Sequence, residues 1–390
     1  MSEAFIVAAA RTAGGKRKGR ASGWHPADLA GLVLDNLVER TGVDPARIDD
    51  VIMGCVGQVG QQSLNIARGA ILASKLPESV PGVTIDRQCG SSQQALHFAA
   101  ATVMAGTMDI IIAAGVESMT RVPMGLSSEF LAKAGHGEAM SPRQVQRYPD
   151  VVFNQFTGGE MMARKYELTK EMLDEFGFHS QQKAIAATRA GAFNKEIVAI
   201  EVTLADGTTE LHTVDEGIRF DVTREGVAAV KLIFPDGRHT AATASQICDG
   251  ASGVMVVNER GLKALGLQPL ARVHSMTVSA GDPVIMLEEP LFCTDKALRR
   301  AGMKIDDIDL FEVNEAFASV PLAWLKHTGA DPARLNVHGG AIALGHPLGG
   351  SGTKLMTTLV HALATHGKRY GLQTMCEGGG LANVTIVERL

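Results

Sequence analysis

The stretch "LVERTGVDPARIDDVIMGCV" (residues 37–56) has a counterpart in the second half of the chain, "ALRRAGMKIDDIDLFEV" (residues 297–313). Both stretches have the pattern of a helix end, a glycine, the tripeptide Ile-Asp-Asp and a buried strand. The correspondence continues downstream, because a glycine-serine helix start follows each copy at nearly the same distance, at Gly90 and at Gly350. Self-similarity of this length indicates that one α/β unit, a sheet covered by helices, occurs twice.

The two copies differ by one long segment, roughly residues 119–243, which has no counterpart in the second copy. It contains short helical stretches, turns and a charged, hairpin-like stretch, "LADGTTELHTVDEGIRF" (residues 204–220). An insertion of this size at the end of a strand usually shapes a substrate site. We therefore expect an N-terminal half of residues 1–268, which includes an inserted loop domain at about 119–249, and a C-terminal half of residues 269–390. Two such halves imply a shared cleft.

Composition narrows the class of protein. The chain has 390 residues, 45% hydrophobic residues, 43 glycines and a formal net charge of -5, as expected for a globular protein with sizeable cores. The negative charge gives no support for nucleic-acid binding. Five cysteines, an odd number without a CxxC pair, suggest neither a disulfide framework nor a zinc site, so free thiols are expected.

Targeting signals are also not evident in the sequence. The first residues place a short apolar run before a basic cluster, the reverse of a signal peptide, and no stretch has the length and apolar character of a membrane span. The final residues, "VERL", do not resemble a peroxisomal address of the Ser-Lys-Leu type. The cytoplasm is the expected compartment.

The stretch "TIDRQCGSSQQALHFAAA" (residues 84–101) places Cys89 where an expected strand turns into a helix. Unpaired N–H groups and the positive end of the helix dipole at such a corner favour a thiolate over a thiol. Cys89 is therefore a candidate nucleophile. A lone cysteine is by itself more often a small buried hydrophobic residue, and that interpretation stays open at this point.

Two loops in the second copy carry further reactive side chains. The stretch "NVHGGAIALGHPLGGSGTK" (residues 336–354) holds His346 between a glycine and a proline, a rigid setting that suits proton transfer or, alternatively, a histidine satisfied within a turn. The stretch "TMCEGGGLANVTIVERL" (residues 374–390) ends a strand at Cys376, and the three glycines downstream leave backbone N–H groups free to donate. Superposing the repeats sets the Cys89 corner against the His346 corner, so that the three side chains could converge.

Four blocks resemble the signature motifs of the thiolases: "DRQCGSSQQA" (residues 86–95), "FEVNEAFAS" (311–319), "NVHGGAIALGHPLGGSG" (336–352) and "CEGGG" (376–380). The resemblance covers essentially the whole chain in the right order. It implies the α/β thiolase fold, two βαβαβαββ halves in a five-layer αβαβα sandwich with an inserted loop domain, assembled as a homodimer or homotetramer. It also implies an acyltransferase, an acetyl-CoA acetyltransferase or a 3-ketoacyl-CoA thiolase.

The same resemblance implies a role for each motif residue. Cys89, deprotonated by His346, would take the acyl group from an acyl-CoA, and Cys376 would move a proton at the α-carbon of acetyl-CoA. One oxyanion hole would consist of His346 and a water held by Asn314; the other would consist of the backbone N–H groups of Cys89 and Gly378. Coenzyme A and acetyl-CoA enter as substrates, and no metal or permanently bound cofactor is required.

Contacts to coenzyme A are implied at fewer positions. Ser245 matches the serine that contacts the pantetheine arm, and Lys231 lies where a basic residue meets the nucleotide end. Asn154 and Gln155 stand where small-chain biosynthetic thiolases carry a His-Met pair beside the coenzyme A tail. This departure favours 3-ketoacyl-CoA substrates longer or bulkier than acetoacetyl-CoA.

Other interpretations remain to be weighed. Met124, Met161 and Met162 of the insert could line an adaptable acyl pocket or could simply fill a core. A β-ketoacyl synthase shares the fold but uses one cysteine and two histidines, a pattern that Cys376 argues against. A non-catalytic thiolase-like carrier of acyl-CoA or lipid would keep the fold without the chemistry, and the intact motif residues argue against it.

Overall fold

The computed structural model describes residues 2–204 and 206–390. One large sheet contains eleven strands. They are β1 (Phe5–Thr12), β2 (Gly15–Lys16), β3 (Asp50–Gly54), β4 (Gly82–Ile85), β5 (Ile110–Ser118), β6 (Ile197–Val198), β9 (Cys248–Val257), β10 (Ala271–Ala280), β11 (Leu310–Val313), β12 (Tyr370–Glu377) and β13 (Leu381–Glu388). A hairpin does occur in the insert, but it begins before the quoted stretch of residues 204–220. It consists of β7 (Ile200–Thr203) and β8 (Thr209–His212), and only β8 lies within that stretch.

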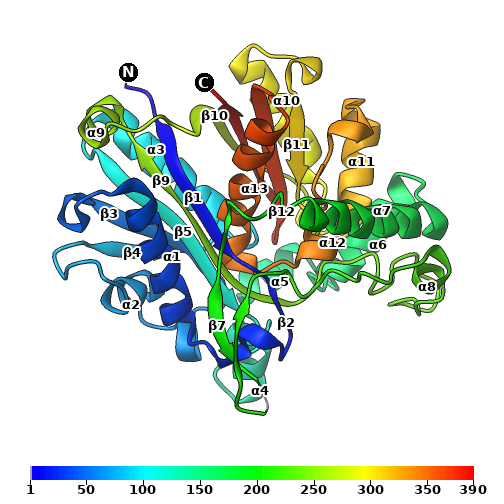
Figure 1. The fold of residues 1–390 in the computed structure, drawn as a ribbon. Helices are drawn as coiled ribbons and strands as arrows, with labels where there is room; N and C mark the ends of the chain where they lie inside the picture. Colours follow the sequence, from blue (N-terminus) through cyan, green and yellow to red (C-terminus); the bar gives the residue numbers. More distant parts are fainter. Residues whose placement is uncertain (1, 205) are drawn as a thin grey trace.

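Helices alternate with these strands (Figure 1). They are α1 (Pro26–Thr41), α2 (Ile66–Leu72), α3 (Ser91–Ala105), α4 (Leu131–Lys133), α5 (Pro142–Arg147), α6 (Gln155–Lys165), α7 (Lys170–Arg189), α8 (Arg224–Ala228), α9 (Glu259–Leu265), α10 (Glu289–Ala301), α11 (Ser319–Thr328), α12 (Ala341–Leu344) and α13 (Ser351–Thr365). Among the described residues, no helix combines the length and the apolar character that crossing a membrane requires.

The strand order confirms the duplication. Neighbouring strands run β11-β12-β13-β10-β1-β9-β5-β3-β4, so that β1, β9, β5 and β3 repeat in mirror order the arrangement of β10, β13, β12 and β11. In each half the pair farther from the junction, β3·β5 or β11·β12, is parallel. The pairs between it and the junction are antiparallel. The halves meet where Phe5 and Ile6 of β1 pair with Arg272 and Ala271 of β10.

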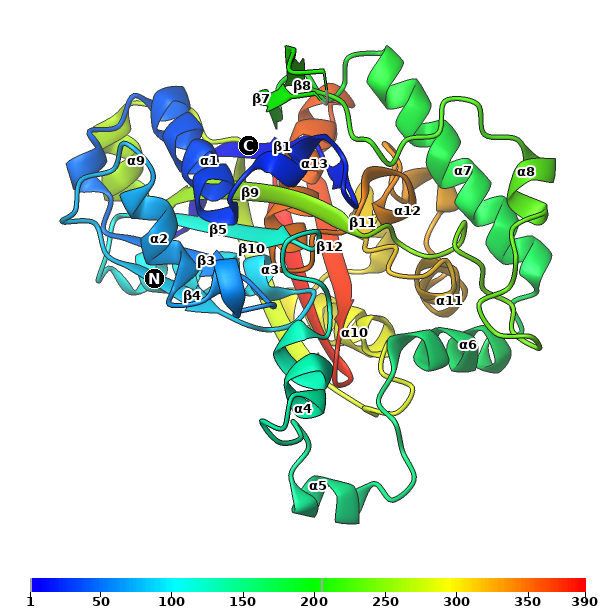
Figure 2. The same ribbon diagram turned by 90° about the horizontal axis from the view of Figure 1, so that it is seen from below.

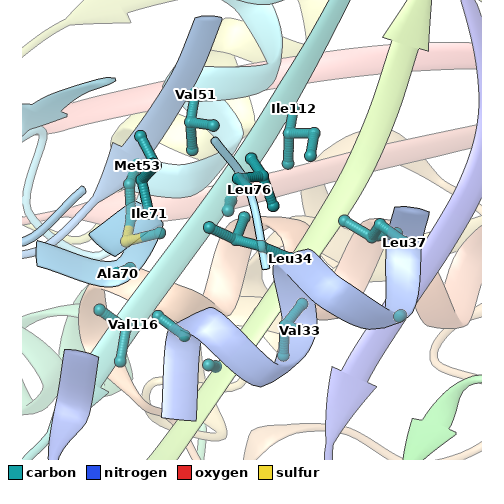
Figure 3. Packing of buried hydrophobic residues seen from close by; sticks show 14 of the residues in the cluster. Val33, Leu34, Leu37, Val51, Met53, Ala70, Ile71, Leu76, Ile112 and Val116 are labelled. Atoms are coloured by element: carbon teal, nitrogen blue, oxygen red, sulfur yellow. The ribbon is translucent and has the colours of Figure 1, made fainter. Parts of the chain in front are cut away.

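The helices form three layers around the two half-sheets. The helices α1 and α2 cover the outer face of the first half, whereas α10 and α11 cover the outer face of the second. Between the half-sheets lie α3 and α13, whose apolar side chains share one core with strands of both halves (Figure 2). Figure 3 shows Leu34 and Leu37 of α1, Ile71 of α2, Met53 of β3 and Ile112 of β5 within the outer core of the first half. The five-layer sandwich is therefore confirmed.

The insert lies between β5 and β9. Figure 2 shows α4 and α5 projecting from the body, while α6 and α7 lie against the second half of the molecule. The predicted boundary at residue 268 falls between α9 and β10, and the domain limits themselves stay a prediction. The insert, a segment of the first half, therefore reaches the cleft that both halves share.

Candidate active site

Cys89 lies at the corner between β4 and α3, as the sequence predicts. Gly90 is the N-cap of α3, and the preceding residue, Gln88, adopts a left-handed backbone conformation with a φ of 48°. Ser91 stabilises the turn, because its hydroxyl donates to the Gln88 carbonyl at 2.6 Å and accepts from the Arg87 N–H at 2.9 Å. The thiol is half-buried, whereas the other four cysteines are buried.

The ionisation of Cys89 differs from the sequence-based expectation. Burial, reinforced by the neighbouring Glu377 carboxyl, raises the pKa of Cys89 to about 12, although the backbone N–H groups of Cys89 and Gly378 act in the opposite direction. A helix terminus contributes up to about 2 kcal/mol at a partly buried site, and one pKa unit corresponds to about 1.4 kcal/mol, so the helix does not offset the raised pKa. The expectation of a resting thiolate is therefore wrong, and the thiol needs a base.

His346 is held as a neutral acceptor. Its Nδ1 lies 2.5 Å from the Ser351 hydroxyl oxygen, which itself donates to the Pro347 carbonyl at 2.9 Å, so that Nδ1 carries the proton and Nε2 is free to accept. The Asn314 side-chain nitrogen lies 3.4 Å from Nε2. Burial, together with the Lys354 ammonium, lowers the pKa of His346 to about 3. The imidazole is therefore neutral at neutral pH, with Nε2 unprotonated.

Two buried carboxylates hold the loop that carries His346. Glu315 accepts from the Ile342 N–H at 3.1 Å and from the Ser180 hydroxyl at 2.6 Å. Glu117, at the end of β5, accepts from the Gly349 N–H at 2.9 Å. Sequence reasoning missed both, although each is an acid at the end of an apolar strand, where an unpaired charge would be costly.

A buried ion network supports the same loop from behind. The Lys354 ammonium donates to the Gly345 carbonyl at 3.3 Å and lies 3.6 Å from Asp215. Asp215 also pairs with Arg11 at 2.8 Å, and Arg11 is fully buried. Since Gly345 precedes His346, this network fixes the peptide that leads into the histidine.

Cys376 is buried at the end of β12, where it faces Ala382 of β13. Burial, and next the neighbouring Cys89 thiol, raise the pKa of Cys376, so the two cysteines lie close enough to interact. Gly378, two residues further on, points its N–H at Cys89. The structure thus brings together Cys89, Cys376 and Gly378, and separately joins His346 with Asn314.

A cavity of about 1030 Å³ opens beside Cys89. Its wall includes Cys89 and Gly378, together with Ala316 and Leu348, each of which is two residues from Asn314 or His346. The insert supplies much of the remainder. Those lining residues are Met124, Gly125, Ser127, Ser128, Ala139, Met140, Gln144, Tyr148, Phe153 and Gln155. The volume of this cavity is at the upper end of the range for small-molecule sites, which is about 300–1,000 Å³.

The methionines divide between two roles. Met124 lines the cavity, where its sulfur lies 3.4 Å from the Gln155 side-chain nitrogen. Met162 is fully buried in the core of the second half, and Met161 packs against that core. Asn154 uses its side chain to cap α6, accepting from the Phe156 N–H at 2.8 Å. Of the adjacent pair 154–155, it is therefore the glutamine that faces the cavity.

The remaining two predicted contacts lie at different depths. Ser245 is half-buried, and its N–H donates to the carbonyl of Ala316, which lines the cavity. Lys231 is exposed. Its neighbour Val230 lines a second, smaller cavity of about 200 Å³ together with Arg219. Ser245 therefore lies beside the Cys89 cavity, and Lys231 lies near the smaller one.

Comparison with known proteins assigns this arrangement to a family. Models of the thiolase N-terminal domain and the thiolase C-terminal domain match residues 4–260 and 267–389. The chain belongs to the thiolase family. Over its full length it is 49% identical to the steroid 3-ketoacyl-CoA thiolase FadA6 of Mycobacterium tuberculosis, of which the match covers 95%. It is 41% identical to the 3-ketoacyl-CoA thiolase of Yersinia pestis and 40% identical to that of Pseudoalteromonas translucida, each covered completely.

This membership confirms the resemblance stated from the motifs. The protein is a thiolase, an enzyme of the acyltransferase class that acts on coenzyme A thioesters. Neither a β-ketoacyl synthase-like enzyme nor a non-catalytic carrier is favoured by these relatives.

Proposed function

We propose that this thiolase works through Cys89, which carries the acyl group, while Cys376 moves the proton at the α-carbon. The observation that carries the proposal is the meeting of Cys89 with the Gly378 N–H and Cys376, contributed by opposite halves of the molecule. A covalent carrier, an acid–base group and oxyanion donors are what reversible cleavage of a bond between two carbonyl groups requires.

In the cleavage direction, the Cys89 proton passes to Nε2 of His346, and the thiolate attacks the 3-keto carbon. The N–H groups of Cys89 and Gly378 stabilise the oxyanion that forms there. The carbon–carbon bond then breaks, its electron pair moves to the α-carbon of acetyl-CoA, and Cys376 protonates that carbon.

The enolate oxygen is stabilised on the other side of the cleft. Asn314 contributes here together with His346, because the Asn314 Oδ1 atom is buried and has no hydrogen-bond partner among the described residues. Because this acceptor has no protein partner, we infer that Asn314 holds a water there. A second coenzyme A thiol then attacks the acyl-Cys89 thioester and releases the shortened acyl-CoA.

We further propose that the acyl group is bulkier than acetoacetyl. The insert-lined cavity has room for it, and one relative, at 49% identity, is named a steroid 3-ketoacyl-CoA thiolase. Such a substrate suits the degradative direction, as in the cleavage step of β-oxidation. A panel of 3-ketoacyl-CoAs should give a higher kcat/KM for bulky substrates. A hundredfold preference for acetoacetyl-CoA, about 2.7 kcal/mol, would contradict this specificity.

The coenzyme A arm is proposed to run from the Cys89 cavity past Ser245 toward the smaller cavity, with Lys231 near the nucleotide phosphates. We propose that Asn154 lies beside this arm without a direct side-chain contact, because its side chain caps α6. A Lys231→Ala variant should raise KM for coenzyme A and leave kcat unchanged, since an exposed lysine contributes charge to binding alone.

We propose that the protein assembles as a homodimer or homotetramer. The strand β4 ends the sheet order, and its backbone edge has no neighbour among the described strands. Val83 on this edge is 43% exposed and Phe98 on α3 is 45% exposed. An unprotected apolar edge of this kind favours pairing with a second copy. Native mass spectrometry should give a dimer or tetramer, whereas a monomer at micromolar concentration would refute the proposal.

We also propose a cytoplasmic location, which the five free thiols fit.

A thiolysis assay tests the catalytic proposal. Loss of the 3-ketoacyl-CoA absorbance on adding coenzyme A should be enzyme-dependent and should vanish in Cys89→Ser. Retention of thiolysis by that variant would overturn the assignment of the nucleophile.

A further inference from the structure

Glu377 is a buried acid next to the reactive thiols with no role in the reaction described above. Its side chain has no exposed surface, and neither carboxyl oxygen has a hydrogen-bond partner among the described residues. Buried carboxylates elsewhere in this site, such as Glu117 and Glu315, accept several hydrogen bonds. A carboxyl group without such donors is much more stable as the neutral acid.

The carboxyl group packs against the residue that follows the nucleophile. A Cβ atom at Gly90 would lie 2.6 Å from the Glu377 carboxyl carbon, so that only glycine leaves room for the acid. Asn383 of β13 closes the other side, where its side chain donates to the Gly90 carbonyl at 3.1 Å. The acid therefore lies directly beneath the turn that presents Cys89.

The electrostatic surroundings of Glu377 agree with a neutral resting form. Burial raises the pKa of Glu377 to about 8, with Arg87 acting against this shift and Asp86 in favour of it. Charged and titratable groups face it from each element packed around it. These groups are Asp86, Arg87, Cys89, Cys376 and Cys293.

We propose that Glu377 is a positioning residue that controls how readily Cys89 loses its proton: the neutral acid permits the thiolate, and the carboxylate opposes it. The inference rests on the proposed role of Cys89 as nucleophile. A carboxylate beneath Gly90 repels a negative sulfur, whereas a neutral acid leaves the N–H groups of Cys89 and Gly378 to stabilise it. The rate of acylation should consequently rise less steeply with pH above pH 8 than it would for a thiol without this neighbour.

Alkylation of Cys89 by iodoacetamide tests this control without requiring catalysis, because the alkylation rate follows the thiolate fraction. In Glu377→Gln we expect Cys89 to react roughly tenfold faster than in the wild type at pH 9, equivalent to one pKa unit, and within about twofold at pH 6.5. Glu377→Asp, which keeps an acid, should keep the wild-type pH profile. Glu289→Gln is the matched control, since Glu289 is another buried acid, on α10, that acts on Cys293.

The wild-type protein alone gives a second test that does not depend on the folding of a variant. A single thiol with a high pKa gives a plot of log rate against pH with a slope of one between pH 6.5 and 9. We expect the slope to fall below one near pH 8, where Glu377 ionises. A slope of one throughout, or a Gln/wild-type ratio that does not change with pH, would overturn the proposal. Absence of thiolysis in the wild type, with the expected alkylation profile present, would instead count against the proposed function.

Discussion

The reactivity of Cys89 depends on its accessibility and on a base, because the resting thiol is protonated. Cys89 is half-buried at the cavity wall, while Cys55, Cys248 and Cys293 are buried. At neutral pH, iodoacetamide should alkylate Cys89 well before these three, and pre-incubation with acetyl-CoA should protect it by acetylation. Peptide mapping checks both expectations. Uniform labelling of the four cysteines would show that the cavity gives Cys89 no advantage.

The two catalytic cysteines should be separable by mutation. Cys376→Ala removes the group that exchanges a proton with the α-carbon but leaves the Cys89 corner unchanged. The variant should therefore still take one acetyl group per chain from acetyl-CoA, while condensation falls by up to roughly 10⁴-fold, the upper end for acid–base catalysis. Intact-mass spectrometry measures the adduct, which hydroxylamine should remove.

Cys89→Ala is the matched control and should neither acylate nor condense. Condensation by Cys376→Ala at close to the wild-type rate would show that Cys376 is structural. Failure to acylate would show that the second thiol also supports the first step.

At the scale of the elements, the close approach of α3 and α13 positions both halves of the site. A Cβ atom at Gly352 of α13 would lie 2.8 Å from the Gln93 Cα atom of α3 and closer still to its amide nitrogen. Gly352→Ala should therefore force the helices apart and lower the free energy of unfolding by about 1–3 kcal/mol or more. It should also lower kcat, because Cys89 and His346 precede these two helices.

Gly69 of α2 provides the comparison, since a Cβ atom there meets its nearest neighbour at an ordinary 3.8 Å. Gly69→Ala should be neutral or stabilising by up to about 1 kcal/mol, because alanine favours the helix. Thermal unfolding and kcat together check the pair. If both substitutions change the free energy of unfolding and kcat to the same extent, α3 and α13 can move apart without cost and the prediction is wrong.

The sequence was sufficient to predict the elements that a local pattern specifies. The duplicated Ile-Asp-Asp stretches predicted two matching half-sheets, and the glycine-serine starts at Gly90 and Gly350 predicted the two central helices. The resting state of Cys89 could not be predicted in this way. Its pKa depends on burial and on Glu377, which is distant in sequence and reaches the thiol only through the packing of β12 against α3.

The supporting contacts of His346 were likewise beyond local pattern. Glu117 reaches Gly349 across the two halves of the molecule, so that no window of sequence contains both partners. The difference between Asn154 and Gln155 had the same origin. Either residue could face a ligand, and only the start of α6 decides that Asn154 caps the helix while Gln155 lines the cavity.

At the scale of the whole molecule, three buried histidines should make the fold sensitive to acid. Burial lowers the pKa of His97 and His346 to about 3 and that of His338 to about 4. Unfolding releases each side chain to bind a proton below pH 6.5, so the free energy of unfolding falls as the pH falls through that value. Each histidine should remove about 1.4 kcal/mol between pH 7.5 and 5.5.

Urea denaturation at several pH values measures this loss. His97→Gln should remove about a third of the contribution of the three histidines, whereas His136→Gln, in an exposed loop, should leave it unchanged. A His97 variant with the full wild-type pH dependence would show that His97 is not kept neutral by the fold.

The position of β13 in the sheet also determines when a newly synthesised chain can become active. The ribosome makes β13 after every other described strand, yet β13 lies between β12 and β10 and pairs with both. A nascent chain therefore exposes the Cys89 corner long before Cys376 can be locked into place. A product that terminates before β13 lacks the strand that pairs with both β12 and β10. Truncated translation products should accordingly lack thiolysis activity.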